Sequence, residues 1–150
     1  MLSSKKLQEK LIETLCAINQ KEYTFEEVSI PTVPDGKVIF EFGLAEDENF
    51  NYIDRDEVKK ALDLIVKGNF ETLDFFCCMR YYEGKEENKR ALKFDYCLLR
   101  TVFGKDLFEI QVFHERGPRY LSPEDLIYFV FNEINKDSSK KILKKTSFNP

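Results

Sequence analysis

The 150-residue sequence contains no tryptophan and a single histidine, His114. One histidine excludes every site that needs two, including the HExxH zinc motif. The four cysteines fit neither a disulfide framework nor a CxxC metal motif; they are Cys16, Cys77, Cys78 and Cys97. We therefore expect reduced thiols that pack as small apolar side chains, with no metal and no cofactor.

Long apolar runs are also missing from the chain. No stretch approaches the ~18 residues that a membrane-spanning helix needs, and the opening MLSSKKLQEK lacks the apolar core of a signal peptide. An apolar fraction of 43% with 33% charged residues is typical of a globular domain and not of a disordered chain. Together with reduced cysteines, these features predict a cytoplasmic protein.

Charge is distributed unevenly along the sequence. Residues 136–150 hold five lysines and one aspartate, a net charge of +4, although the whole chain carries −4. Residues 1–135 therefore carry −8 and do not suit a phosphate backbone. We predict a single domain at 1–135 and a basic, flexible C-terminal tail at 136–150. The tail could bind RNA or an anionic membrane surface, or act only as a solubilising terminus.

Hydrophobic periodicity predicts three helices and five strands. The helices cover 4–20 after a serine cap, 55–67 between an Asp54–Glu57 capping box and Gly68, and 123–135 after Ser122. The strands cover 23–30, 37–45, 70–82, 91–103 and 107–114, and a bulge explains the broken alternation in the first. The order α-β-β-α-β-β-β-α predicts an α+β fold with an antiparallel sheet and helices packed on it.

This element order resembles that of small secretion-chaperone-like proteins, which dimerise and hold segments of partner proteins. The resemblance rests on the order of helices and strands, and the middle helix of this chain comes at a different point. It implies a protein-interaction function. The sequence itself shows no catalytic signature.

The register of residues 70–114 decides which side chains share a face. Symmetric hairpin loops place Tyr96 opposite both Cys77 and His114 on the face that the helices cover. His114 is then a packed residue near the sheet edge that forms a hydrogen bond with the Tyr96 hydroxyl. No nucleophile motif accompanies it.

The same register places Phe76, Cys97, Leu99 and Phe113 together on the opposite face of the sheet. An apolar patch with a charged rim predicts an interface with a partner or with a second copy of the chain. Two alternatives are a helix or tail of the protein itself that covers the patch, and a register displaced by one residue.

Three basic residues fall around the corner before the last helix, namely His114, Arg116 and Arg119. With the helix N-terminus nearby, they form a candidate site for a phosphate or carboxylate, unless they pair with the acids at 115, 124 and 125. The acidic residues at 46–48 lack the spacing of a calcium loop. We therefore expect a non-enzymatic protein-interaction or chaperone-like domain that self-associates through the outer sheet face. The alternative is an enzyme or small-ligand-binding domain that uses the basic corner.

Overall fold

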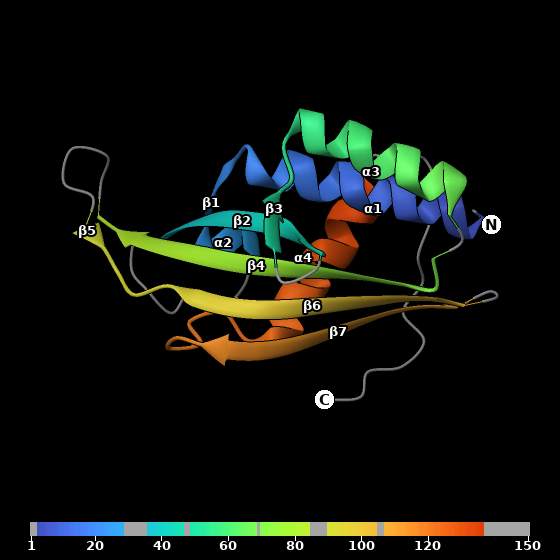
Figure 1. Ribbon diagram of the computed structural model, residues 1–150. Helices are drawn as coiled ribbons and strands as arrows, with labels where there is room; N and C mark the ends of the chain where they lie inside the picture. Colours follow the sequence, from blue (N-terminus) through green and yellow to red (C-terminus); the bar gives the residue numbers. More distant parts are fainter. Residues whose placement is uncertain are drawn as a thin grey trace.

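The computed structural model describes residues 3–28, 36–46, 49–68, 70–84, 90–104 and 107–136. In these ranges, four helices pack with one antiparallel sheet of seven strands, which confirms the α+β class (Figure 1). The basic tail lies outside the described residues except for Lys136, which is the last residue of the final helix.

The helices are α1 (Ser4–Asn19), α2 (Phe25–Val28), α3 (Arg55–Lys67) and α4 (Pro123–Lys136). The predicted caps are present at all three long helices. Ser3 accepts a hydrogen bond from the Lys6 amide, Asp54 from the Glu57 amide, and Ser122 from the Asp125 amide. Each cap satisfies one of the unpaired amides of a first helical turn.

The strands are β1 (Glu22–Thr24), β2 (Lys37–Glu46), β3 (Asn49–Tyr52), β4 (Thr72–Glu83), β5 (Arg90–Ala91), β6 (Asp95–Gly104) and β7 (Leu107–Arg116). The main path of the sheet is β1-β2-β4-β6-β7, so its strands follow chain order. β1 pairs with residues 37–39 of β2, and β3 pairs with residues 43–46 of the same strand. β5 pairs with the last two residues of β4.

The predicted bulged strand at 23–30 is wrong. After three residues of β1 the chain turns into the short helix α2, and Phe25 at its start is buried. The amide and hydroxyl of Thr24 both donate to the Glu27 carboxylate. Thr24 and Glu27 thus form part of a capping box, and this helix start accounts for the slip in alternation.

The helices cover one face of the sheet, and the hydrophobic core lies between them. α1 contacts β2 and α4, α4 contacts β7, and α3 packs on the outside of α1. The apolar face predicted for 37–45 points into this core, where Val38, Phe40 and Phe42 are fully buried. In Figure 1, α4 passes behind the sheet, and no described helix covers the face of β4, β6 and β7 turned to the viewer.

The register of β6 differs from the prediction by one residue. Tyr82 and Glu83 do pair with Ala91 and Arg90 as a symmetric loop requires, yet farther along Met79 pairs with Asp95. One extra residue between β5 and β6 therefore acts as a bulge and shifts the remaining pairs. Consequently Cys97 lies opposite Cys77, and Leu99 opposite Phe75.

The one-residue shift exchanges the residues on the two faces of β6. Cys97 and Leu99 are 1% and 0% exposed in the core, so their predicted place on the outer face is wrong. The second hairpin also differs by one residue, since Gly104 pairs with Leu107. This second difference restores β7 to its predicted orientation, with Phe113 outside and His114 on the helix side next to Cys97.

Candidate functional site

Asp95 is a fully buried carboxylate, 0% exposed, at the first position of β6. The bulge that precedes it turns its side chain toward the helix side of the sheet. A buried charge without partners is strongly unfavourable, so the surrounding chain must supply hydrogen-bond donors. It supplies four.

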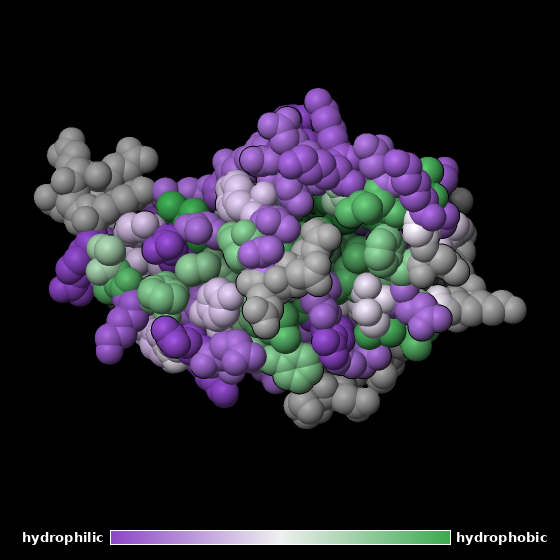
Figure 2. Space-filling model, in the orientation of Figure 1, coloured by the Kyte–Doolittle hydropathy of each residue, from purple (hydrophilic) through white to green (hydrophobic). Residues whose placement is uncertain are grey.

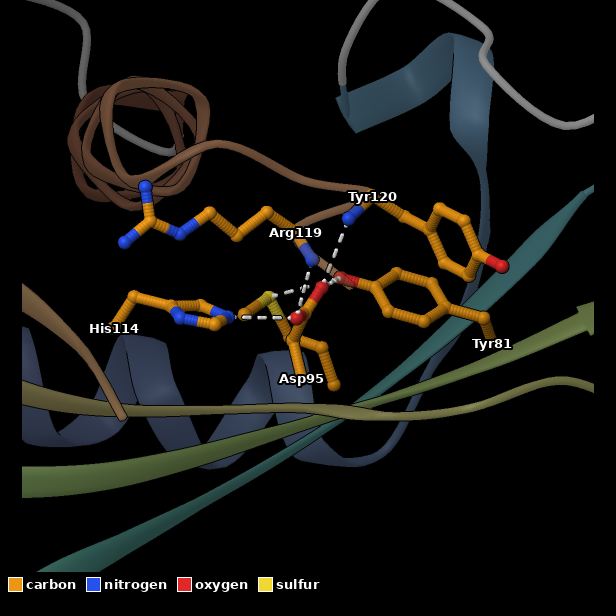
Figure 3. Close-up of polar contacts among 6 residues, drawn as sticks. Tyr81, Asp95, His114, Arg119 and Tyr120 are labelled. Atoms are coloured by element: carbon orange, nitrogen blue, oxygen red, sulfur yellow. Dashed lines mark hydrogen bonds and ion pairs between the residues drawn. The ribbon is translucent and has the colours of Figure 1, made fainter. Parts of the chain in front are cut away.

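The four donors come from three parts of the chain (Figure 3). The Tyr81 hydroxyl donates to Asp95 Oδ2 at 2.6 Å, and His114 Nε2 lies 2.8 Å from Oδ1. The backbone amides of Arg119 and Tyr120 donate to Oδ1 and Oδ2 at 2.7 and 3.0 Å. Both carboxylate oxygens therefore have two partners each, and the arrangement holds the corner before α4 against β4, β6 and β7.

The corner has an unusual backbone that brings these amides to the carboxylate. Gly117 has φ 116° and Arg119 has φ 58°, both in the left-handed region. A side chain at Gly117 would place its Cβ 2.4 Å from Asp95 Oδ1 and from the Phe94 carbonyl oxygen. Only glycine allows this close approach of the corner to the sheet.

The hydrogen-bonding groups of this cluster satisfy one another. A proton on Nε2 lets His114 donate to Asp95, and its side chain is only 8% exposed. Burial and the hydrogen bond to Asp95 both raise the pKa of Tyr81, which therefore stays a neutral donor. An acid that orients a histidine also occurs in catalytic sites, yet no hydroxyl or thiol nucleophile contacts the ring among the described contacts.

The structure brings only part of the candidate anion site together. His114 is directed at Asp95, and its predicted hydrogen bond with Tyr96 is absent from the described contacts. Arg119 contributes its backbone amide, while the residues Arg116 and Arg119 are both exposed at the surface. In Figure 3 the Arg119 side chain runs away from the carboxylate. The anion that the corner holds is therefore the chain's own Asp95.

All four cysteines are free thiols with buried positions. Burial raises the pKa of each one, most strongly for Cys77 and to about 12 for Cys97. A raised pKa keeps the thiol protonated and unreactive at neutral pH. Cys16, Cys77 and Cys97 therefore pack in the core, and Cys78 is buried on the outer face of β4 opposite Tyr96.

A second candidate site is the sheet face that the helices leave uncovered. Phe50 of β3, Phe76 of β4 and Tyr96 of β6 form a continuous line of rings, which we call the aromatic row. The ring centroids are 6.3 Å apart for Phe50 and Phe76, and 5.6 Å apart for Phe76 and Tyr96. Phe50 lies directly over Gly43, where a Cβ would be 2.4 Å from its ring.

The face continues to β7, where Phe113 is 46% exposed and pairs with Leu98 of β6. Figure 2 shows apolar side chains that interrupt the charged surface across this side of the molecule. Of the four residues predicted for an interface, Phe76 and Phe113 lie on this face, whereas Cys97 and Leu99 do not.

Ion pairs lie beside the aromatic row. Arg80 pairs with Glu41, and its guanidinium is also 5.9 Å from the centroid of the Phe94 ring. Arg100 pairs with Asp74 through two hydrogen bonds of 2.9 and 3.0 Å. Because each arginine has a carboxylate partner on the neighbouring strand, the face has little unbalanced charge to attract a polyanion.

Sequence reasoning missed both Asp95 and Phe50. Asp95 falls in phase with the apolar residues of its strand once the register is correct, and a buried position for an acid demands donors. The Gly117-Pro118 corner, which the sequence does show, is the signal that could have indicated a tight approach to that strand. Phe50 lies in a four-residue strand within a polar stretch, which has no periodicity to recognise.

Within the described ranges, no group of His, Cys, Asp and Glu side chains is suited to hold a metal ion. None of the described helices has the length and apolar character required to cross a membrane. Comparison of the chain with protein-family models, with curated proteins and with solved structures gave no match.

Proposed function

We propose that this chain is a non-enzymatic protein-interaction domain that binds an apolar segment of another protein on its uncovered sheet face. The observation that carries the proposal is the aromatic row, which no described helix covers.

Burial of the row against a partner has a favourable free energy. Each Å² of apolar surface removed from water contributes roughly 25 cal/mol. Phe50 in the row is 41% exposed in the isolated chain, and Phe113, farther along the same face, is 46% exposed. Aromatic side chains are also enriched where binding energy concentrates in protein interfaces. The ion pairs beside the row suit the polar rim of such an interface.

The basic corner supports the alternative function less well. Its histidine and two of its backbone amides already bind Asp95, so an external anion would meet only the exposed guanidinium groups of Arg116 and Arg119. Exposed ion pairs of that kind contribute at most about 1 kcal/mol. The geometry therefore favours the sheet face.

The test is suppression of aggregation of a denatured model client, the reduced insulin B chain, followed by light scattering. The wild type should suppress aggregation, and Phe50→Glu should lose most of this effect because it places a charge in the aromatic row. Phe50 lies on β3, which pairs with β2, and β4 and β6 separate β2 from β7, so this variant leaves the β7 edge intact.

The matched control is Leu64→Glu on α3. Leu64 is 46% exposed, close to the 41% of Phe50, but lies on a helix. The Leu64→Glu variant should suppress aggregation as well as the wild type does. Equal activity of Phe50→Glu and Leu64→Glu, or no activity of the wild type, would contradict the proposal.

A further inference from the structure

The strand β7 forms one end of the sheet path and has a long edge without a described neighbour. Among the described strands it is hydrogen-bonded only to β6, and it runs for ten residues, Leu107–Arg116. In Figure 1 no labelled element lies beyond its outer edge. Exposed edges of this length normally carry a proline, a bulge or a charge directed inward, because they can pair with another chain.

The half of β7 next to the hairpin has none of these protective features. Its helix-side residues are Phe108, Ile110 and Val112, all apolar and packed against the core. The register irregularity of the strand comes only at its far end, where Tyr96 pairs with Arg116 and Cys97 with His114. Residues 107–113 therefore pair regularly with β6, and their helix-side members carry no charge.

The backbone groups of Phe108, Ile110 and Val112 point away from β6. The Phe103 amide bonds to the Glu71 carbonyl on the β4 side, so Phe103 and its partner Phe108 are not hydrogen-bonded to each other. By alternation, the N–H and C=O groups of Phe108, Ile110 and Val112 face the free edge. None of them has a backbone partner among the described contacts outside the sheet ladder.

We propose that two copies of this chain join through β7 in an antiparallel pair whose two-fold axis passes Ile110. Ile110 then lies opposite Ile110 of the second copy, and Phe108 opposite its Val112. About six backbone hydrogen bonds form, two for each of three hydrogen-bonded pairs. The two sheets become one continuous sheet, and this inference does not depend on the proposed function.

The side chains select this register among its neighbours. On the uncovered face it places Glu109 opposite Gln111 of the second copy, a carboxylate opposite an amide donor, and Leu107 opposite Phe113. A shift in one direction places Glu109 opposite Glu109, and a shift in the other places it opposite Phe113. Like charges directly opposite each other are destabilising, and a charge opposite an apolar ring gains nothing. Leu107 and Phe113, 58% and 46% exposed in the single chain, gain the most cover.

Cysteine cross-linking tests the register directly. A mixture of Leu107→Cys and Phe113→Cys should give a covalent dimer under mild oxidation, because this pair lies at the close spacing of a non-hydrogen-bonded position. Either variant alone should give little, since its two cysteines would be about 20 Å apart along the paired strands. The four native cysteines are buried and add little background.

Light scattering on the full chain gives the second readout. The wild type should be a dimer, and Ile110→Lys should raise its dissociation constant at least tenfold because two ammonium groups would meet at the axis. Gln111→Lys is the control on the same strand, where the new charge faces Glu109 of the second copy, so it should remain a dimer. Circular dichroism establishes that both variants are folded.

The outcomes separate the two proposals. A wild type that stays monomeric, or equal cross-linking by Leu107→Cys alone, would overturn the β7 pairing. Phe50→Glu should remain a dimer, because the aromatic row lies away from the β7 edge. Loss of client suppression in that dimer would support the proposed function, and intact suppression would contradict it, whatever the fate of the β7 pairing.

Discussion

At the scale of single residues, Asp95 connects segments that are far apart in the sequence. Its carboxylate binds Tyr81 from β4, His114 from β7 and two backbone amides from the corner before α4. Hydrogen bonds to a charged acceptor are stronger than neutral ones, and four of them compensate the burial of the charge. The sole histidine of the chain thus has a structural partner.

We expect Asp95→Asn to lower the free energy of unfolding by about 2–4 kcal/mol, because its amide nitrogen would face donors that then lack an acceptor. Urea denaturation measures this loss. Asp74→Asn is the matched control, since Asp74 forms a partly exposed pair with Arg100. Its loss should stay below about 1 kcal/mol. Similar losses for the two variants would show that the four-donor cluster adds no stability.

Gly117→Ala should also destabilise the protein, by about 1–3 kcal/mol. The new methyl group would meet Asp95 and the Phe94 carbonyl at a backbone φ of 116° that alanine rarely adopts. Gly104→Ala is the control, because its nearest neighbour atom lies at 3.7 Å. Thermal unfolding should show a clearly lower midpoint for Gly117→Ala only. An unchanged midpoint in both would disprove the close approach at the corner.

At the scale of elements, a side chain completes the edge of the sheet. β1 pairs with β2 at residues 37–39 and β3 pairs with it at 43–46, which leaves Phe42 next to the gap. Asn19, the last residue of α1, fills this gap. Its amide accepts from the Phe42 N–H at 2.7 Å and donates to the Phe42 carbonyl at 2.9 Å. The side chain thus bonds to β2 as the backbone of a neighbouring strand would.

Asn19→Ala should lower the free energy of unfolding by about 2–4 kcal/mol, because it leaves the buried Phe42 N–H without its acceptor. Chemical denaturation should be compared with Asn132→Ala, the same substitution at an exposed position of α4. That control should be neutral or slightly stabilising, since alanine favours a helix. A loss no larger than the control's would mean that water replaces the Asn19 amide.

The elements themselves were largely predictable from local chemistry, whereas their alignment was not. Caps such as Asp54 and Ser122 determine where helices begin, and alternation determines where strands run. The bulge between β5 and β6 adds one residue without a local signal, and that residue decides whether Cys97 and Leu99 face the core. The prediction of the interface residues was affected most, because a one-residue shift in register moves every side chain of a strand to the opposite face.

At the scale of the whole molecule, a buried thiol and a buried phenol make the free energy of unfolding depend on pH in the alkaline range. Burial raises the pKa of Cys97 to about 12 and that of Tyr23 to about 12, against ordinary values of 9.0 and 10.0. Above these ordinary values the unfolded chain loses protons that the folded chain keeps. The free energy of unfolding should therefore be fully present below pH 9 and fall from pH 9 toward pH 12.

Urea denaturation in a reducing buffer across this range provides the measurement. Cys97→Ala should reduce the slope from pH 9 upward, and Tyr23→Phe should reduce it only above pH 10. Each group contributes at most about 1.4 kcal/mol per pH unit. Stability that is flat or rises between pH 9 and 11 in the wild type would refute this account.

The order of strands in the sheet has a consequence for how the chain is made. Because the path β1-β2-β4-β6-β7 follows the sequence, each strand can add to a neighbour that has already left the ribosome. Asp95 emerges 24 residues before the first of its two backbone donors, Arg119. Until that corner and α4 emerge, β7 lacks the helix that contacts its inner face, and Asp95 lacks its full set of partners. Completion of the last helix is therefore the step that closes the core, while the uncovered sheet face and the β7 edge remain open in the finished chain.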